Sequence, residues 1–275
     1  MFVIVESSVT AAAQLQSDVD KISHWANQWL VKFNPSKSES LVISRKRNQV
    51  LHPTVYMFNT SIPSVDSHKH LGVFLSNDGS WHQQINYIKD KAWSRVNVMK
   101  RLRYRLDRKS LEVVYISFIR PILEYACVIW DNCTQYEKDE LDKIQNEAAR
   151  VVTGCTRLVS LRQLQIECGW ESLSSRRHKQ KLILFFKMKH GQTPDYLSDM
   201  IPQTVGQLSA RTLRNSSNIT NIRSRTSLYE GCMISSRTVV KFSVFFIKIL
   251  QNFQEIMFHL YLKQNHQLEV AITYT

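Results

Sequence analysis

Three side chains that could hold a transition metal alternate along one short segment. Asp66, His68 and His70 are separated by single residues, and in a β-strand every second side chain points to the same face of the sheet. Carboxylate and imidazole groups are common zinc ligands, but such a site also needs a fourth ligand or a bound water. A metal-dependent enzyme using these three residues is therefore an alternative and not the main prediction.

A long cationic segment points to phosphate binding instead. Residues 81–110 contain nine Lys and Arg side chains and two acidic ones. Apolar residues recur there every three or four positions, which predicts an amphipathic helix with a cationic face. The nine cations are Lys89, Lys91, Arg95, Lys100, Arg101, Arg103, Arg105, Arg108 and Lys109. We expect this face to contact nucleic-acid phosphates without reading sequence, and the alternative is an ordinary solvated helix surface.

The composition agrees with a polyanionic partner. The 275 residues contain 36 Lys and Arg against 23 Asp and Glu, which gives a formal net charge of +13. Such an excess favours nucleic acid first and acidic membranes second. Charges interrupt the most apolar run, residues 239–262, so we expect no membrane span. The five cysteines lack the short spacing of a zinc motif, and we expect reduced thiols in an intracellular protein, in the nucleus or the cytoplasm.

The sequence predicts both strands and helices, and therefore an α+β fold. The predicted strands are residues 1–5, 40–44, 54–58 and about 68–75, and a helix is predicted over 15–29. From residue 81 onward the pattern is helical. Asp107 and Ser110 are candidate caps of a second helix that stops near Pro121, and Gly154 ends a third helix over 136–153. Shorter helical patterns follow at 161–167 and from Leu173 to Gly191.

Several short strings together resemble the C-terminal half of a jockey-like non-LTR retrotransposon reverse transcriptase. They are Trp25-Ala26-Asn27-Gln28-Trp29, Lys32-Phe33-Asn34-Pro35-Ser36-Lys37-Ser38-Glu39, His68-Lys69-His70-Leu71-Gly72-Val73, Arg120-Pro121-Ile122-Leu123-Glu124-Tyr125, Trp130, Gln145-Asn146-Glu147-Ala148-Ala149-Arg150, Gly169-Trp170 and Pro194-Asp195-Tyr196-Leu197. They occur in the family's order over about residues 1–230. The resemblance implies a palm remnant at 1–80, a helical thumb at 81–155 and a helical connector at 156–202. A polar linker at 203–230 and a helical tail at 231–275 would follow.

The resemblance also implies roles for four residues. Lys37 would match the palm lysine that lies near the phosphates of the incoming nucleotide, and the alternative is a solvated loop lysine. His70, Leu71 and Gly72 would match the primer grip, where a glycine lets a phosphate backbone approach closely. The alternative for Gly72 is an ordinary bulge or edge-strand glycine.

The resemblance further implies that the catalytic centre is missing from this chain. In this family an adjacent Asp-Asp pair lies in a hairpin turn, and residues 1–5 resemble the strand that leaves it, so we expect the pair to precede Met1. Nucleotidyl transfer needs carboxylates that hold two divalent ions. We therefore predict no polymerase activity from this chain alone and no bound cofactor, with Mg²⁺ expected only for an intact palm.

The main functional prediction is a truncated RNA-directed DNA polymerase that still binds RNA, DNA or an RNA/DNA hybrid. A helical adaptor for an unidentified protein partner is the second alternative, beside the metal-dependent enzyme. Trp93 and Tyr104 interleave with the cationic face and could stack on bases, although packing is the main interpretation. The remaining candidates are predicted to be structural: helix solvation for Arg176, Arg177, Lys179 and Lys181, core packing for Trp25, Trp29, Trp81, Trp130 and Trp170, and inert thiols for Cys127 and Cys133.

Overall fold

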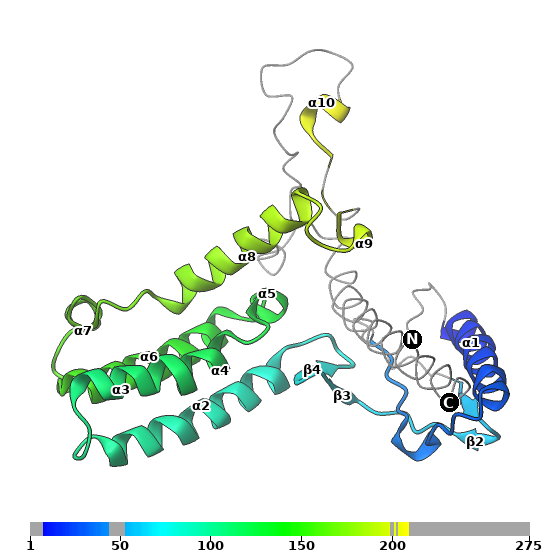
Figure 1. Ribbon diagram of the computed structural model, residues 1–275, viewed down its shortest axis with the longest axis horizontal. Helices are drawn as coiled ribbons and strands as arrows, with labels where there is room; N and C mark the ends of the chain where they lie inside the picture. Colours follow the sequence, from blue (N-terminus) through cyan, green and yellow to red (C-terminus); the bar gives the residue numbers. More distant parts are fainter. Residues whose placement is uncertain (1–7, 44–52, 199–200, 202, 209–275) are drawn as a thin grey trace, which may run out of the picture. The chain divides into compact units, whose positions relative to one another are not determined.

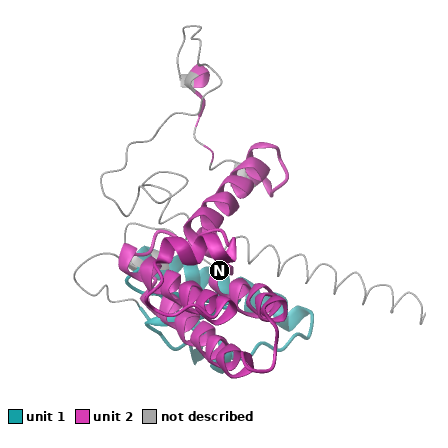
Figure 2. Cartoon of the chain, turned by 90° about the vertical axis from the view of Figure 1, so that its left-hand side faces the viewer, with its two compact units in different colours: residues 1–79, 241–275 teal, residues 80–240 magenta. Residues whose placement is uncertain are grey.

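The computed structural model describes residues 8–43, 53–198, 201 and 203–208. These residues belong to two compact units, one that ends at Gly79 and one that begins at Ser80 (Figure 2). The predicted α+β class is confirmed, because the chain is mostly helical with two small antiparallel sheets near its N-terminus. The strand predicted at 1–5, the tail at 231–275 and most of the linker lie outside the described residues.

The first unit joins a helix to a hairpin. Helix α1 (Ser8–Gln28) contains most of the helix predicted at 15–29. Its Val19 packs against Val55 and Ile62 from the hairpin. The Gln16 side chain also donates a hydrogen bond to the Tyr56 carbonyl (2.9 Å) and accepts one from the Tyr56 amide (2.8 Å). One glutamine thus replaces the partners that this edge strand would otherwise lack.

The hairpin that Gln16 holds is short. Strands β1 (Tyr56–Met57) and β2 (Thr60–Ser61) pair antiparallel through a turn at Phe58 and Asn59, whose φ angles are 49° and 60°. Two successive positive φ values are typical of the tight turns whose twist suits a hairpin. The strand predicted at 40–44 is wrong over its described part, since only Ser40 forms a bridge, to Ser64. Nearby, Pro35–Lys37 form the short 3-10 helix η1.

The single strand predicted at 68–75 is also wrong. It is a hairpin, in which β3 (Ser67–His70) pairs antiparallel with β4 (Val73–Ser76). Leu71 and Gly72 form its turn, with φ angles of 44° and 83°. The apolar run through Leu71 hides this turn, because leucine is an uncommon residue at positive φ whereas glycine adopts it freely.

The second unit is helical. Its long helices are α2 (His82–Leu102), α6 (Gln135–Thr153) and α8 (Leu173–Lys189); its shorter elements are α3 (Arg108–Val114), the π-helical segment η2 (Tyr115–Ile119), α4 (Arg120–Glu124), α5 (Cys127–Trp130), α7 (Leu161–Cys168), α9 (Asp195–Ser198) and α10 (Val205–Leu208). Helices α2 and α6 run side by side, and the α3–α4 stretch packs on both (Figure 1). No helix of the described residues is long and apolar enough to cross a membrane.

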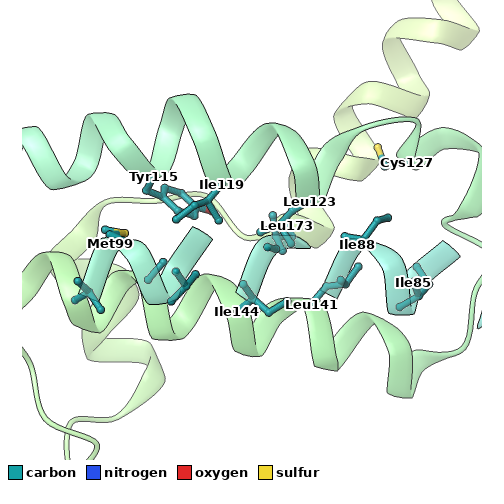
Figure 3. Close-up of a cluster of buried hydrophobic side chains, with 14 of the residues drawn as sticks. Ile85, Ile88, Met99, Tyr115, Ile119, Leu123, Cys127, Leu141, Ile144 and Leu173 are labelled. Atoms are coloured by element: carbon teal, nitrogen blue, oxygen red, sulfur yellow. The ribbon is translucent and has the colours of Figure 1, made fainter. Parts of the chain in front are cut away.

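One buried core joins α2, α3–α5, α6 and the start of α8, as Figure 3 shows in part. The stripe predicted on α2 is buried and meets side chains from α3–α4, α6 and the start of α8. Members of this core are Ile85, Ile88, Ala92, Val96, Met99, Leu111, Tyr115, Ile119, Leu123, Leu141, Ile144, Ala148 and Leu173. Burial of each large aliphatic side chain stabilises the fold by about 1.5–3 kcal/mol.

Local signals set most helix ends where they were predicted. Asp107 caps α3 by accepting a hydrogen bond from the Ser110 amide, and Gly154 ends α6 with a φ of 74°. The stop predicted near Pro121 is wrong. The Arg120 amide bonds to the Tyr115 carbonyl five residues back, and this wider turn accommodates a proline that lacks an amide donor and would crowd the preceding turn of a regular helix.

The tryptophans divide between buried and exposed positions. Trp130 is fully buried, and Trp170 stacks on Tyr115 with ring centroids 3.9 Å apart while donating to Glu112 (2.9 Å). Trp81 donates to Asn132 at 2.6 Å. Trp29 is 57% exposed, so the prediction that it packs in a core is wrong.

Candidate nucleic-acid interface

The nine predicted cations do not form one continuous surface that is free to bind a ligand. Three of them turn toward carboxylates of the same helical unit. Lys89 lies 2.9 Å from Glu140 and Lys100 lies 2.7 Å from Glu147, both across the α2–α6 contact. Arg108 donates to the Glu167 carboxylate (2.8 Å) and to the Glu167 carbonyl (2.7 Å) at the end of α7.

The pairs between α2 and α6 neutralise two carboxylates of α6, Glu140 and Glu147. The hydrogen bond from Lys100 lowers the pKa of Glu147, and hydrogen bonds from Lys143 and Lys89 lower the pKa of Glu140. Each carboxylate is therefore ionised and neutralised by its lysine. As a result, Glu140 and Glu147 of α6 are not available as partners for the remaining cations of α2.

The other six cations are exposed. They are Lys91, Arg95, Arg101, Arg103, Arg105 and Lys109. None has a carboxylate within ion-pair distance among the residues that the structure describes. Lys91 and Arg95 are one turn apart on α2, on the side away from the buried stripe. We call this group of six the outer cationic surface.

Aromatic side chains accompany the outer cationic surface. The Lys91 ammonium lies 5.7 Å from the Tyr87 ring centroid, and the Arg103 guanidinium lies 5.9 Å from that of Tyr104. Trp93 is half-buried in the core and covered by Lys100 at 5.8 Å. Of the two predicted stacking residues, Tyr104 is thus accessible and Trp93 packs. Tyr87 was not among the predicted stacking residues, although it lies one helical turn before Lys91 in the sequence.

Three residues of the second basic patch, Arg176, Arg177 and Lys181, are largely buried, so the interpretation as helix solvation is wrong for them, whereas Lys179 is exposed. Arg177 is 2% exposed and donates from Nε to Asp131 Oδ1 at 2.8 Å. Lys181 donates to the other carboxylate oxygen of Asp131, Oδ2, and the Lys138 ammonium lies 3.8 Å from Asp131 Oδ1. Arg176 Nη2 donates to Glu124 (3.0 Å), and Lys179 pairs with Glu171 (2.7 Å). The bonds of Arg177 and Lys181 to Asp131 join α8 to the end of α5, and the bond of Arg176 to Glu124 joins it to the end of α4.

The residues with roles implied by resemblance lie in the first unit. Lys37 is exposed at the end of η1. His70 ends β3, and Leu71 and Gly72 form the turn of the β3–β4 hairpin, so the grip segment is a turn and not a continuous strand. Burial, followed by the neighbouring His68, lowers the pKa of His70, whose Nε2 is buried without a hydrogen-bond partner.

The alternating acid and histidines do not converge on one point. The His68 and His70 rings share a face, with centroids 5.8 Å apart, but His68 Nδ1 lies 2.6 Å from Glu39. Asp66 accepts a hydrogen bond from Asn77 (2.8 Å). Within the described ranges, no three His, Cys, Asp or Glu side chains gather closely enough to hold a metal ion. The geometry therefore gives no support to the metal-site alternative.

The two thiols beside Trp130 are buried. Burial raises the pKa of both Cys127 and Cys133 to about 12, and Cys127 Sγ contacts Gln180 at 3.0 Å. A thiol of such high pKa is a poor nucleophile at neutral pH. The prediction that these thiols are structural agrees with this burial.

Comparison with known proteins finds two relatives from Drosophila melanogaster. The chain is 28% identical over 148 residues to the probable RNA-directed DNA polymerase from transposon X-element. It is 24% identical over 151 residues to the probable RNA-directed DNA polymerase from transposon BS. Each match covers 53% of this chain and 16% of the relative. No family model and no solved structure matches. Over about half of its length, the chain is thus distantly similar to RNA-directed DNA polymerases of non-LTR retrotransposons.

Proposed function

We propose that the helical unit is the thumb-like part of a retrotransposon reverse transcriptase and binds RNA, DNA or an RNA/DNA hybrid without reading its sequence. The observation that carries this proposal is the division of the cations. Lys89, Lys100 and Arg108 take the nearby carboxylates, and the outer cationic surface keeps its charge free for an outside anion. Phosphate contacts of this kind position a strand and carry no base information.

The proposal is tested by the salt dependence of binding. Fluorescence anisotropy would follow a labelled RNA/DNA hybrid between about 50 and 200 mM salt. The variant K91Q/R95Q/R101Q removes three charges of the outer cationic surface. The control K32Q/K187Q/K189Q removes three exposed charges elsewhere. Because each phosphate contact contributes about 0.9 to the slope of log K against log salt, the first variant should lower that slope by about 2–3.

Two results would contradict this proposal. Equal loss of binding in the two variants would mean that net charge, and not this surface, attracts the ligand. A wild-type chain that binds none of the three nucleic acids would end the proposal altogether.

The second part of the proposal is that this chain holds nucleic acid without extending a primer. Nucleotidyl transfer uses divalent ions held by carboxylates, and the described residues bring no three such ligands together. Primer extension with purified protein, magnesium and deoxynucleotides should give no product. Incorporation above background would refute this part and leave the binding proposal intact.

One observation favours the adaptor as a second candidate. Leu182, Ile183 and Phe186 on α8 are each more than half exposed, and a contiguous exposed apolar surface often marks a protein contact. Salt-insensitive binding of a protein partner, combined with no binding of nucleic acid, would favour this candidate over the first.

A further inference from the structure

The turn between α2 and α3 holds an aromatic ring out in the solvent. Tyr104 is 88% exposed, whereas Leu102 and Leu106 on either side of it pack against the core. The amides of Arg105 and Leu106 both donate to the Leu102 carbonyl, at 2.9 and 3.0 Å. The backbone of this turn is therefore fixed at both ends, and the ring projects from a rigid support.

One cation lies over the ring. The Arg103 guanidinium lies 5.9 Å from the Tyr104 centroid, and a Cβ placed on Gly154 would lie 3.6 Å from Arg103 Nη2. Arg103 thus bridges the turn and the end of α6, and Figure 1 shows the α2–α3 turn and the α6–α7 link at the same end of the helical unit. Arg101 and Arg105, three residues before Tyr104 and one after it in the chain, are exposed, and so is Arg157, three residues after Gly154.

Three acidic side chains on or near this turn and on α6 and α7 already have partners. Asp107 accepts hydrogen bonds as the cap of α3, and Glu167 is held by Arg108. Glu147 is held by Lys100. A ligand at the turn would therefore meet an exposed ring and guanidinium groups that, among the described residues, have no carboxylate within ion-pair distance.

We propose that this turn is a stacking site for an unpaired nucleotide, in which Tyr104 stacks on the base and Arg101, Arg103 and Arg105 contact the adjoining phosphates. The inference rests on the proposed function and specifies its ligand: a single-stranded segment or end of RNA or DNA. The faces of paired bases are covered by their neighbours, whereas an unpaired base offers its face to an aromatic side chain. The stacking is sequence-tolerant, because every base has such a face.

Replacement of the ring tests the site. We expect Tyr104→Ala to weaken binding of a single-stranded oligonucleotide about 5- to 150-fold, the range that one base–aromatic stack supplies. Tyr104→Phe keeps the ring and should bind like the wild type. Tyr136→Ala removes a tyrosine that is 70% exposed on α6 and serves as the matched control. A blunt duplex should bind Tyr104→Ala as well as it binds the wild type, and the salt slope should not change, because no charge is lost.

A spectroscopic readout separates stacking from general damage to the fold. An oligonucleotide with 2-aminopurine at an unpaired position should lose fluorescence on binding the wild type and Tyr104→Phe, but not on binding Tyr104→Ala at saturation. Unchanged single-strand affinity in Tyr104→Ala, or an equal loss for single strand and duplex, would overturn the stacking site alone. A wild-type chain that binds neither ligand would overturn the proposed function together with this site.

Discussion

Arg177 Nε donates a hydrogen bond to Asp131 Oδ1 across 2.8 Å, and both side chains are shielded from water. Lys181 binds the same carboxylate, so one acid on the α5 side holds two cations of α8. Loss of the shared acid would leave two charges in a poorly hydrated place. The attachment of α8 to the bundle therefore depends on Asp131.

We predict that Asp131→Asn destabilises the helical unit by about 3–5 kcal/mol, because removing one partner leaves uncompensated buried charge. Urea unfolding followed by circular dichroism measures the change. Lys179→Met is the control, because the Lys179–Glu171 pair is exposed and should be worth about 0–1 kcal/mol. Similar losses in the two variants would show that the burial of Asp131 has no energetic consequence.

We predict that Leu71→Asn stabilises the first unit by about 0.5–1 kcal/mol, although it replaces an apolar residue. Leu71 has a φ of 44° and is 45% exposed, and a side chain such as leucine pays about 1–2 kcal/mol for a left-handed conformation. Asn followed by Gly is the preferred pair for this turn. Thermal unfolding compares the variant with Leu75→Asn, which should destabilise because Leu75 is buried. A destabilised Leu71→Asn would argue against the hairpin.

We predict that the first unit loses stability as the pH falls below about 6.5. Burial lowers the pKa of His70 below its ordinary value, so between the two pKa values the unfolded chain binds more protons than the folded one. Stability is then fully present above the unfolded pKa and decreases as the pH falls toward the folded pKa. Histidine proton shifts followed by NMR would measure the pKa directly. In His70→Gln the stability profile should flatten over this range, and an unchanged profile would exclude His70 as its source.

We predict that Cys127 and Cys133 resist alkylation at pH 8 in the folded chain. Their pKa values of about 12 leave very little thiolate, and both side chains are buried. Iodoacetamide should label the half-exposed Cys155 before Cys127 and Cys133, as peptide mass spectrometry would reveal. In urea the labelling should become uniform. Rapid modification of Cys127 without denaturant would contradict the packing around Trp130.

Local patterns predicted the helices of this chain better than its turns. The stripe from Ile85 to Met99 was visible because its spacing repeats within one element, and Asp107 and Gly154 carry their capping chemistry in their own residue type. The β3–β4 hairpin was missed because its turn uses Leu71 where Asn is usual. The helix stop predicted near Pro121 was wrong because a π-helical turn before the proline lets the helix continue through it.

Charge pairing was beyond the reach of local patterns. Nothing around Lys89 or Lys100 in the sequence shows that Glu140 and Glu147 will face them from a helix some 50 residues later. The burial of Arg177 had only a weak signal, the acidic Asp131 directly after the apolar Ile129-Trp130. The roles implied for Lys37 and for the His70–Gly72 segment stay predictions.

The π-helical segment Tyr115–Ile119 sets the direction in which α4 leaves it. Leu111, Tyr115, Ile119 and Leu123 are spaced by four and all are buried, yet in a regular helix each step of four drifts by about 40° around the axis. The wider turn takes up part of that drift. Deleting one residue of this segment would restore a regular helix. It would also rotate Leu123 by about 100° around the helix axis, away from the core in which it is buried.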